Sequence, residues 1–269
     1  MRTFTIVGLG FMGASLALRI KDCIPSSRIV GISRSREKAL RAKKKGIIQD
    51  TGTLPPPDTD ILIFATPIRS IPSLLKKLLP HISPSTLITD MGSTKEWIHK
   101  EISSFLPPEY TFIGSHPFCG SEKQGMEHAN PEIFPGAWCF LTLEKETGKV
   151  EYLRKFWEEL GMKVKVISPE IHDRILAYTS HLPHVVAVVL INSLPQEYLS
   201  LTGTGFQDTT RIAGGGVDIW EDIISTNREN LLSAMEDFRK EWELVEKKIS
   251  QNDISSILKK AKERRESII

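Results

Sequence analysis

The feature that most constrains the fold is a glycine-rich turn near the amino terminus. Gly8, Gly10 and Gly13 directly follow an apolar run, residues 3–7, and open a helical pattern. The first glycine allows a tight turn, the second lets the backbone approach a pyrophosphate, and the third lets the helix pack closely on a sheet. Because N–H groups at a helix N-terminus bind phosphate, this order predicts a dinucleotide site. The expected contacts are Gly8, Gly10, Phe11, Met12 and Gly13.

Apolar runs and helical patterns alternate along residues 1–168. Strands are expected at 3–7, 28–32, 61–65, 87–89, 111–113, 138–143 and 163–167. Helices are expected at 11–21, 36–45, 71–79, 94–105 and 149–160. Such alternation predicts an α/β fold with a doubly wound, Rossmann-type parallel sheet that helices cover on both faces.

The pattern changes at Ser168 and Pro169, where a serine N-cap followed by proline predicts the start of a helix. Only helical patterns follow. We therefore expect two domains, a dinucleotide-binding Rossmann domain over residues 1–168 and an all-α substrate and dimerisation domain over residues 169–269. Within the second domain, residues 226–229 are typical of a capping box that opens a long helix.

A narrow apolar stripe follows that capping box in a four-three alternation. Its members are Leu231, Met235, Phe238, Trp242, Val245 and Ile249. A stripe of this kind packs either on its own domain or against a second copy of the chain. Large apolar side chains on one narrow face favour the second arrangement, so a homodimer through the helical domain is expected.

The composition is that of a soluble globular protein and argues against several classes of function. A net charge of +2 gives no support to nucleic-acid binding, and the basic runs at 41–45 and 259–265 are typical of solvated helix faces. None of the three cysteines has C-x-x-C spacing, which favours a reducing compartment. No secretory segment opens the chain, and its longest apolar run, 185–191, is short for a membrane span. A cytoplasmic protein without a membrane partner is expected.

The end of the second expected strand bears on the choice of cofactor. Sites for NAD usually carry an acidic residue there, but this chain has Ser33, Arg34, Ser35 and Arg36. Hydroxyl and guanidinium groups suit a phosphate, so the sequence favours NADP over NAD. In the alternative interpretation, Ser35 caps the next helix and both arginines lie in solvent.

Polar residues also follow other expected strands. Thr66 and Pro67 come after residues 61–65 and are expected to line the nicotinamide side of the cofactor site. His116 lies among glycines and a proline after the run 110–113. A neutral imidazole held in a rigid loop is suited to general-base catalysis. Because ligands bind at the carboxyl ends of parallel strands, both segments belong at the ligand-binding edge of the sheet.

Five ordered motifs resemble those of the prephenate/arogenate dehydrogenase family of tyrosine biosynthesis. They are the nucleotide turn, D-x-G-S-x-K from Asp90, G-x-H-P-x-x-G-x-E-x-x-G from Gly114, S-H-L-P-H from Ser180 and D-x-T-R from Asp208. The set covers most of the chain, and its order is more specific than any single motif. The resemblance implies NAD(P)-dependent oxidative decarboxylation of prephenate to 4-hydroxyphenylpyruvate, or of arogenate to tyrosine.

The roles of individual residues follow from this resemblance. His116 matches the catalytic histidine, which accepts the proton of the ring hydroxyl while hydride leaves the same carbon. Ser93 matches a serine that orients the hydroxyl and the histidine, and Arg211 matches an arginine that binds a substrate carboxylate. A substrate-proximal histidine pair and an acidic loop residue correspond to His181, His184 and Glu122.

Each of these residues also has a structural interpretation. Ser93 with Glu96 forms a second capping-box pattern, so Ser93 could cap a helix as well as orient the substrate. Glu122 could serve only as an acceptor that stabilises its loop. Arg211 could pair with Asp208 or Glu221.

His181 and His184 could be a buried polar pair beside a proline. Their i,i+3 spacing is only a weak indication of a metal, and no metal site is expected. The glycine run at 214–216 departs from the family pattern and leaves the shape of the segment after Arg211 open.

Two other functions fit the nucleotide turn alone. A β-hydroxyacid dehydrogenase or imine reductase also joins a Rossmann domain to helices, but it usually carries a catalytic lysine or aspartate on its interdomain helix. The S-H-L-P-H and D-x-T-R segments do not match that pattern. A non-catalytic NADP-sensing protein would need the turn but neither His116 nor Arg211. A fused regulatory or chorismate mutase domain is not expected in a chain of 269 residues.

Overall fold

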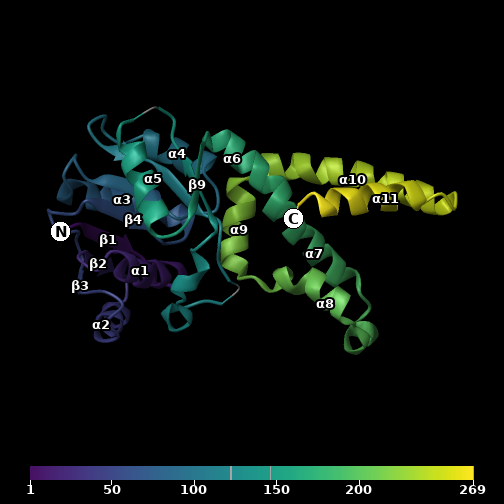
Figure 1. Ribbon diagram of the computed structural model, residues 1–269, viewed down its shortest axis with the longest axis horizontal. Helices are drawn as coiled ribbons and strands as arrows, with labels where there is room; N and C mark the ends of the chain where they lie inside the picture. Colours follow the sequence, from purple (N-terminus) through teal and green to yellow (C-terminus); the bar gives the residue numbers. More distant parts are fainter. Residues whose placement is uncertain (122, 146, 269) are drawn as a thin grey trace.

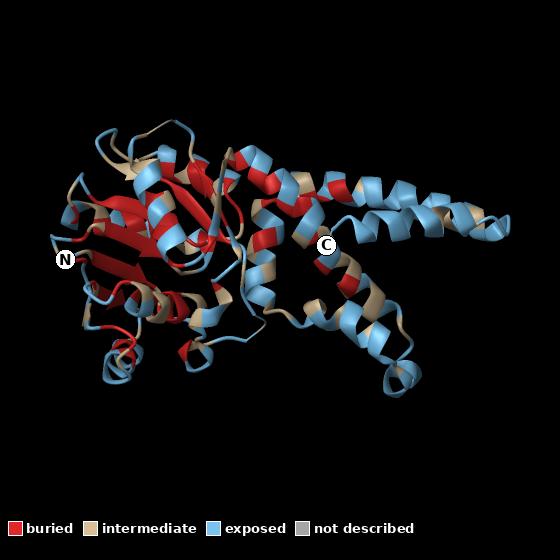
Figure 2. Cartoon of the chain, viewed as in Figure 1, coloured by how far each residue is buried: buried red, intermediate tan, exposed pale blue. Residues whose placement is uncertain are grey.

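The computed structural model describes residues 1–121, 123–145 and 147–268. An α/β half at the amino end joins an all-α half whose long helices extend away from it (Figure 1). Most buried residues lie in the α/β half, whereas the long helices are mostly exposed (Figure 2). The expected fold class, a Rossmann-type sheet followed by helices, is confirmed.

The main sheet has six parallel strands in the order β3-β2-β1-β4-β5-β6. They are β1 (Thr3–Val7), β2 (Arg28–Ile32), β3 (Asp50–Gly52), β4 (Ile61–Phe64), β5 (Leu87–Asp90) and β6 (Thr111–Phe112). Strands β1, β4 and β5 are buried along their whole length, as continuous apolar runs predict. The strand order reverses between β1 and β4, which is where doubly wound sheets bind their ligands.

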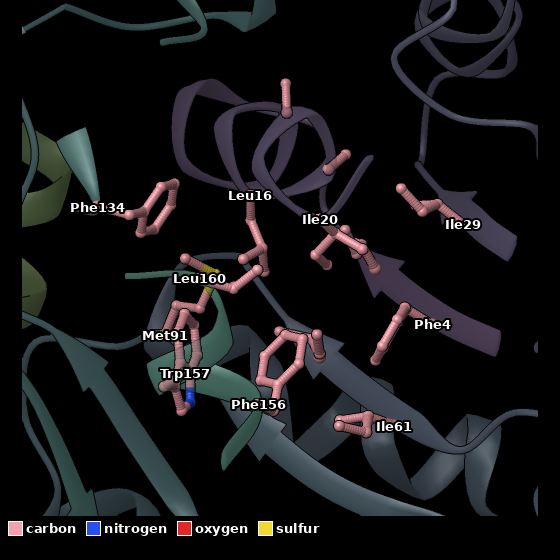
Figure 3. Packing of buried hydrophobic residues seen from close by; sticks show 14 of the residues in the cluster. Phe4, Leu16, Ile20, Ile29, Ile61, Met91, Phe134, Phe156, Trp157 and Leu160 are labelled. Carbon is pink, nitrogen blue, oxygen red and sulfur yellow. The ribbon is translucent and has the colours of Figure 1, made fainter. Parts of the chain in front are cut away.

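Helices cover both faces of this sheet. They are α1 (Phe11–Cys23), α2 (Arg36–Lys44), α3 (Ile71–Leu78), α4 (Glu96–Ser103) and α5 (Lys149–Glu159). All five were expected, and each end lies within two residues of its predicted position. On one face, Phe4 of β1 meets Phe156 of α5 with ring centroids 5.2 Å apart, and Leu16 of α1 fills the same layer (Figure 3). Helices α3 and α4 pack on the opposite face.

The expectation of one continuous sheet is wrong for its last two strands. β8 (Trp138–Thr142) and β9 (Lys163–Ile167) pair in a separate three-stranded sheet with β7 (Gly114–Pro117). β7 has no strand pattern in the sequence, because glycine and proline, at its two ends, are both poor strand formers. β7 runs antiparallel to β8, which requires no helical crossover between them. One buried residue, Ile113, separates β6 from β7, so the chain passes directly from one sheet to the other.

The helical half begins where the sequence predicts. Ser168 Oγ accepts a hydrogen bond from the backbone N–H of Ile171 at 3.3 Å and caps α6. The helices are α6 (Pro169–Leu176), α7 (Leu182–Ser193), α8 (Thr204–Thr210), α9 (Val217–Thr226), α10 (Arg228–Ser250) and α11 (Ser255–Glu266). A π-helical turn, Ala177–His181, joins α6 to α7 without a break.

The capping box expected at residues 226–229 is wrong. Asn227 precedes α10, but its side chain makes no capping hydrogen bond. Its Nδ2 instead donates to the carbonyl oxygen of Asp173 in α6 at 2.8 Å. Thr226 Oγ1 lies 2.7 Å from Thr94 Oγ1, across the junction with the α/β half. Thr226 and Asn227 therefore make tertiary hydrogen bonds instead of capping α10.

An apolar groove of about 700 Å³ lies between α7 and α10. Of the predicted stripe, Leu231 is buried within the chain, whereas Met235, Phe238 and Trp242 line the groove. Trp242 is 62% exposed. Packing within one chain thus covers only the start of the stripe.

The continuous helix Pro169–Ser193 is long and apolar enough, at a mean hydropathy of 1.5, to cross a membrane by length and composition alone. Its first part holds the buried polar residues His172, Asp173 and His181, which bond to other elements of the fold. Apolar side chains of its second part line the groove against α10. The absence of a membrane partner remains a prediction.

Candidate active site

A cavity of about 460 Å³ lies where the second sheet, the loop after β7 and the helical half meet. Four of the expected site residues line it, namely Ser93, His116, His181 and Arg211. Glu122 lies outside the described residues. The structure therefore brings together side chains that are more than a hundred positions apart in the sequence.

His184 is buried behind this cavity rather than lining it. Its ring stacks on the indole of Trp220, with centroids 3.4 Å apart and 11° between the planes. Trp220 itself lines the cavity. Within the part of the chain that the structure describes, Nδ1 of His184 has no hydrogen-bond partner, and no group of three or more His, Cys, Asp or Glu side chains is arranged to hold a metal. His184 thus supports a ring of the cavity wall and does not line the cavity itself.

His116 lies on a strand and not in a loop as expected. It occupies β7 opposite Phe140 of β8. The rings of Phe118 and Phe140 flank the imidazole, with centroids 5.6 and 6.5 Å away. Strand pairing and aromatic contacts together hold the ring, which is only 7% exposed, at one position in the cavity wall.

A chain of hydrogen bonds leads from His116 into the helical half. Nδ1 of His116 lies 2.9 Å from Nε2 of His172, and Nδ1 of His172 lies 2.7 Å from Oδ1 of Asp173. The Asp173 carboxylate also accepts the backbone N–H groups of Lys95 at 2.7 Å and Glu96 at 2.9 Å. All of its contacts are therefore with donors.

These contacts determine where each ring carries its proton. Because ionised Asp173 only accepts, Nδ1 of His172 is the donor and Nε2 of His172 carries a lone pair. Nδ1 of His116 must then donate to that lone pair. The proton of neutral His116 is thereby placed on Nδ1, and its Nε2 is left as an acceptor, which is the state that a general base needs.

The electrostatic surroundings keep His116 neutral. Burial lowers its pKa well below the ordinary range, and His172 and Lys95 act in the same direction. The Lys95 ammonium is fully buried 2.5 Å from Asp90, and Asp90 also accepts the backbone N–H groups of Gly92 and Ser115. The Asp90 carboxylate therefore ties the end of β5 to β7.

Asp173 takes over the capping role that the sequence assigned to Ser93. Helix α4 starts after Lys95, and no side chain of the described residues in its own segment caps it. The free N–H groups of Lys95 and Glu96 instead point at the carboxylate of Asp173. The capping interpretation of Ser93 is wrong, and Ser93 lines the cavity.

The nucleotide turn has the geometry expected of it. Gly8 has φ +105°, a conformation that strongly favours glycine. A Cβ on Gly13 would lie 1.9 Å from the Gly8 carbonyl oxygen, so only glycine fits there. A Cβ on Gly10, the residue before α1, would meet no atom within 4 Å. The turn thus leaves open space at the start of α1, where a pyrophosphate would bind.

The segment after β2 combines both of its predicted interpretations. Ser35 Oγ accepts from the backbone N–H of Lys38 at 3.2 Å and caps α2. Arg34 and Arg36 are exposed beside it, and Ser33 is half-buried. After β4, Thr66 lies against the turn, because a Cβ on Gly8 would come within 2.8 Å of its methyl carbon. Pro67 then starts a short 3₁₀ turn at this edge of the sheet.

Sequence reasoning missed His172, Asp173 and Asn227. A signal was present for the first two, since His172 shares a helix face with Leu176 and is as fully buried as that leucine. Polar residues on an apolar helix face need buried partners. Asn227 could not be found in this way, because its partners come from α6 and the π-helical turn, more than forty positions away.

Family models match both halves of the chain. Residues 16–166 match the nucleotide-binding domain of prephenate dehydrogenase, and residues 168–263 match its dimerization domain. The chain belongs to the prephenate dehydrogenase family. Membership confirms the resemblance seen in the sequence and the expected enzyme class, an oxidoreductase of tyrosine biosynthesis.

Curated relatives support this assignment over nearly the whole chain. The prephenate dehydrogenase of Bacillus subtilis (strain 168) is 32% identical over 272 residues, which cover 96% of this chain and 72% of the relative. The prephenate dehydrogenase of Lactococcus lactis subsp. cremoris (strain MG1363) is 33% identical over 267 residues, covering 96% and 74%.

Solved structures agree in shape. Prephenate dehydrogenase from A. aeolicus, in complex with hydroxyphenyl propionate and NAD+, has a TM-score of 0.90 at 32% identity and covers 100% of this chain and 99% of that one. Synechocystis arogenate dehydrogenase scores 0.84 at 28% identity, covering 99% and 100%. A 3-hydroxyisobutyrate dehydrogenase from Mycobacterium tuberculosis scores 0.55 at 13% identity over 81% and 73%, which shows a shared fold alone. The alternative β-hydroxyacid dehydrogenase function therefore lacks family support.

Proposed function

We propose that this chain catalyses the oxidative decarboxylation of prephenate with His116 as the general base. The observation that carries the proposal is the Asp173–His172–His116 chain, which leaves Nε2 of His116 unprotonated at a cavity wall. In prephenate the reacting carbon carries a hydroxyl group. An acceptor nitrogen on a fixed ring can take the proton of that hydroxyl as the carbon is oxidised.

The reaction then balances without a further base. Nε2 of His116 takes the hydroxyl proton, and the electrons of the O–H bond form the carbonyl bond as the hydride leaves the carbon. A bound nicotinamide dinucleotide supplies the hydride acceptor. The bond to the ring carboxylate then breaks and CO₂ leaves. The electrons of that bond complete the aromatic ring and push the carbonyl electrons onto the oxygen, which takes the proton back from His116 to form the phenol of 4-hydroxyphenylpyruvate. We assign Ser93, which lines the same cavity, to the orientation of the hydroxyl.

Cationic side chains in the cavity suit a dianionic substrate. Arg211 and Lys123 both line it, and none of the described lining residues is an aspartate or glutamate. A guanidinium group binds a carboxylate with two parallel hydrogen bonds. We assign Arg211 to a substrate carboxylate, and the two cations together favour prephenate, with two carboxylates, over arogenate, whose side chain is zwitterionic.

For the cofactor we propose NADP in preference to NAD. The turn at Gly8, Gly10 and Gly13 fits the pyrophosphate of either dinucleotide. The segment after β2 has hydroxyl and guanidinium groups where an acidic residue would grip a ribose 2′-hydroxyl and repel a 2′-phosphate. Arg34 is exposed at that position, and we assign it to the phosphate.

We further propose that the active form is a homodimer through the helical half. Met235, Phe238 and Trp242 leave an apolar groove open on a single chain. The same surface on a second copy can cover it about a twofold axis. A monomer mass for the wild-type protein at micromolar concentration in light scattering would contradict this part of the proposal.

The test of the function is an assay with purified protein. Prephenate with NADP should yield the reduced cofactor, CO₂ and 4-hydroxyphenylpyruvate, and arogenate should react more slowly. A 3-hydroxy acid should give no reduced cofactor. Turnover of the 3-hydroxy acid, or cofactor binding without turnover of either cyclohexadienyl substrate, would overturn the proposal in favour of the competing reductase or sensor functions.

A further inference from the structure

Two histidines line the cavity, and hydrogen bonds hold the Nδ1 edge of each. His181 lies in the π-helical turn and is 1% exposed. Its Nδ1 lies 3.0 Å from Nδ2 of Asn227, at the start of α10. The opposite edge of the ring, with Nε2, is the one left for the cavity that His181 lines.

The orientation of the Asn227 amide is determined from both sides. Its Nδ2 also lies 2.8 Å from the backbone carbonyl oxygen of Asp173, which can only accept. Its Oδ1 accepts from Nδ2 of Asn230 at 2.8 Å. Exchanging the amide oxygen and nitrogen would set two acceptors against each other at the Asp173 contact. The group that faces His181 is therefore a donor.

We propose that Asn227 is a positioning residue that holds neutral His181 in the tautomer protonated on Nε2, so that His181 is a hydrogen-bond donor in the active site. A donor at Nδ1 requires a lone pair on that nitrogen, which leaves the ring proton on Nε2. The neighbours of the ring agree with a neutral imidazole. Burial lowers the pKa of His181 to about 4, with the Asp173 carboxylate acting in the opposite direction and His184 in the same direction.

The two cavity histidines then have opposite polarity. His116 presents an acceptor, fixed by His172 and Asp173, whereas His181 presents a donor, fixed by Asn227. Only His116 can take a proton from the substrate. Resting on the proposed function, this inference assigns His181 to an oxygen acceptor of the substrate, of the carboxylate or carbonyl class. It also gives a physical reason why the enzyme has one base and not two.

The tautomer can be measured without turnover. Protein labelled with ¹⁵N at histidine should show, in a long-range ¹H–¹⁵N correlation spectrum at neutral pH, a protonated Nε2 and an unprotonated Nδ1 for His181. His116 should show the reverse pattern. A protonated Nδ1 on His181 in the wild-type protein would overturn the inference whatever the activity, and failure to oxidise prephenate would overturn only the proposed function.

A double-mutant cycle separates positioning from a structural effect. Asn227→Leu, which keeps the volume but removes the donor, should lower kcat/KM for prephenate about 10- to 100-fold and leave the KM for the dinucleotide unchanged. His181→Gln supplies a fixed amide donor in place of the imidazole. In that background, Asn227→Leu should change kcat/KM by less than about threefold.

Thr226→Val is the matched control, because it removes a hydrogen bond to Thr94 at the same junction without touching His181. This variant should keep the wild-type kcat/KM for prephenate. An equal loss from Asn227→Leu in the wild-type and His181→Gln backgrounds would show that Asn227 acts through the fold, and the positioning role would be wrong. If Asn227→Leu does not fold, the spectrum of the wild-type protein still decides the question.

Discussion

The α/β half and the helical half differ in how much apolar surface each buries within the chain. In the first, continuous apolar strands are covered on both faces, and two large clusters of buried side chains fill the layers (Figures 2 and 3). In the second, α8 and α11 have no buried residue and α10 has two, Leu231 and Ala234. Burial of apolar surface is the main stabilising contribution in a domain. The helical half therefore depends on what it packs against.

The helical half contributes buried polar side chains to the contact between the two halves. Asp173 and His172 reach from α6 to the base on β7, and Asn227 links α6 to α10. The α/β half provides the base and the nucleotide turn, while the helical half sets the tautomer of the base and provides Arg211. Under the proposed function, catalysis is divided between a stable half and a dependent half, and variants in each should fail in different ways.

The largest effect is expected from the base itself. His116→Asn removes the acceptor nitrogen and should lower kcat about 100- to 10,000-fold, while the affinity for the dinucleotide stays near that of the wild type. Steady-state kinetics with prephenate, together with a cofactor titration, measures both. His99→Asn is the control, since His99 is also buried in this half but bonds Thr142 away from the cavity. Near-normal turnover by His116→Asn would remove His116 from the mechanism.

The next effect tests substrate binding by the helical half. Arg211→Ala should raise the KM for prephenate by the equivalent of about 2–5 kcal/mol, because a substrate carboxylate loses its guanidinium partner. The KM for the dinucleotide should not change. Arg174→Ala, at an exposed position in α6, should leave both constants unaltered. An unchanged KM for prephenate with a lowered melting temperature would mean that Arg211 serves the fold.

A smaller effect is expected where the two halves meet. Asp173→Asn removes the negative charge that accepts from Nδ1 of His172, and its amide NH₂ must face at least one N–H group. The tautomer of His116 is then held less firmly, and kcat should fall about 10- to 100-fold. Thermal unfolding should be measured in parallel, because the same carboxylate caps α4. A wild-type kcat in Asp173→Asn would show that the hydrogen bonds from Asp173 through His172 do not position His116.

The pH dependence of the wild-type enzyme sharpens the same point. Burial raises the pKa of Asp173 to about 6, despite the backbone donors that act in the opposite direction. The pKa of His116 is lowered well below the ordinary range of an imidazole, so we assign a fall in activity near pH 6 to Asp173 and not to the base itself. As pH falls through about 6, Asp173 becomes protonated and can donate to Nδ1 of His172. Nε2 of His172 then donates to Nδ1 of His116, so Nε2 of His116 is no longer the acceptor and kcat/KM should fall. This fall should be absent in Asp173→Asn, and a fall centred on the same pH in that variant would contradict the assignment.

The smallest effect concerns the cofactor and lies within the α/β half alone. Arg34→Ala should reduce the preference for NADP over NAD about tenfold, measured as the ratio of the two kcat/KM values. The control Arg41→Ala removes an arginine from α2 that pairs with Glu127. A wild-type preference for NAD of tenfold or more would contradict the proposed cofactor.

The α/β half could be predicted from the sequence because its signals are local. The strands before β7 that have a continuous apolar run could be predicted from their own residues alone. The same is true of the helices between them. β7 was missed because its four residues, Gly114–Pro117, carry no strand pattern and are held by partners from β8. The capping boxes failed for the same reason, since Asp173 supplies from another half of the molecule what Ser93 and Glu96 offered locally.

The sequence predicted which residues form the site but not the tautomers of its histidines. Motif order identified His116, Ser93, His181 and Arg211, which the structure brings to one cavity. Neither tautomer could be deduced, because each depends on hydrogen bonds between elements that are distant in the chain. His184 matched the motif but lies behind Trp220. Sequence spacing alone does not distinguish a ring that faces a ligand from one that supports a neighbour.

The double use of the Asp173 carboxylate also bears on how the molecule matures. One side chain caps a helix of the first half and, through His172, selects the proton position on His116. A nascent chain whose carboxyl-terminal helices are not yet docked has a complete nucleotide turn but a base without a defined tautomer. On the proposed mechanism, such a molecule binds the cofactor but does not turn over the substrate. Docking of α6 on β7 is then the step that completes the active site.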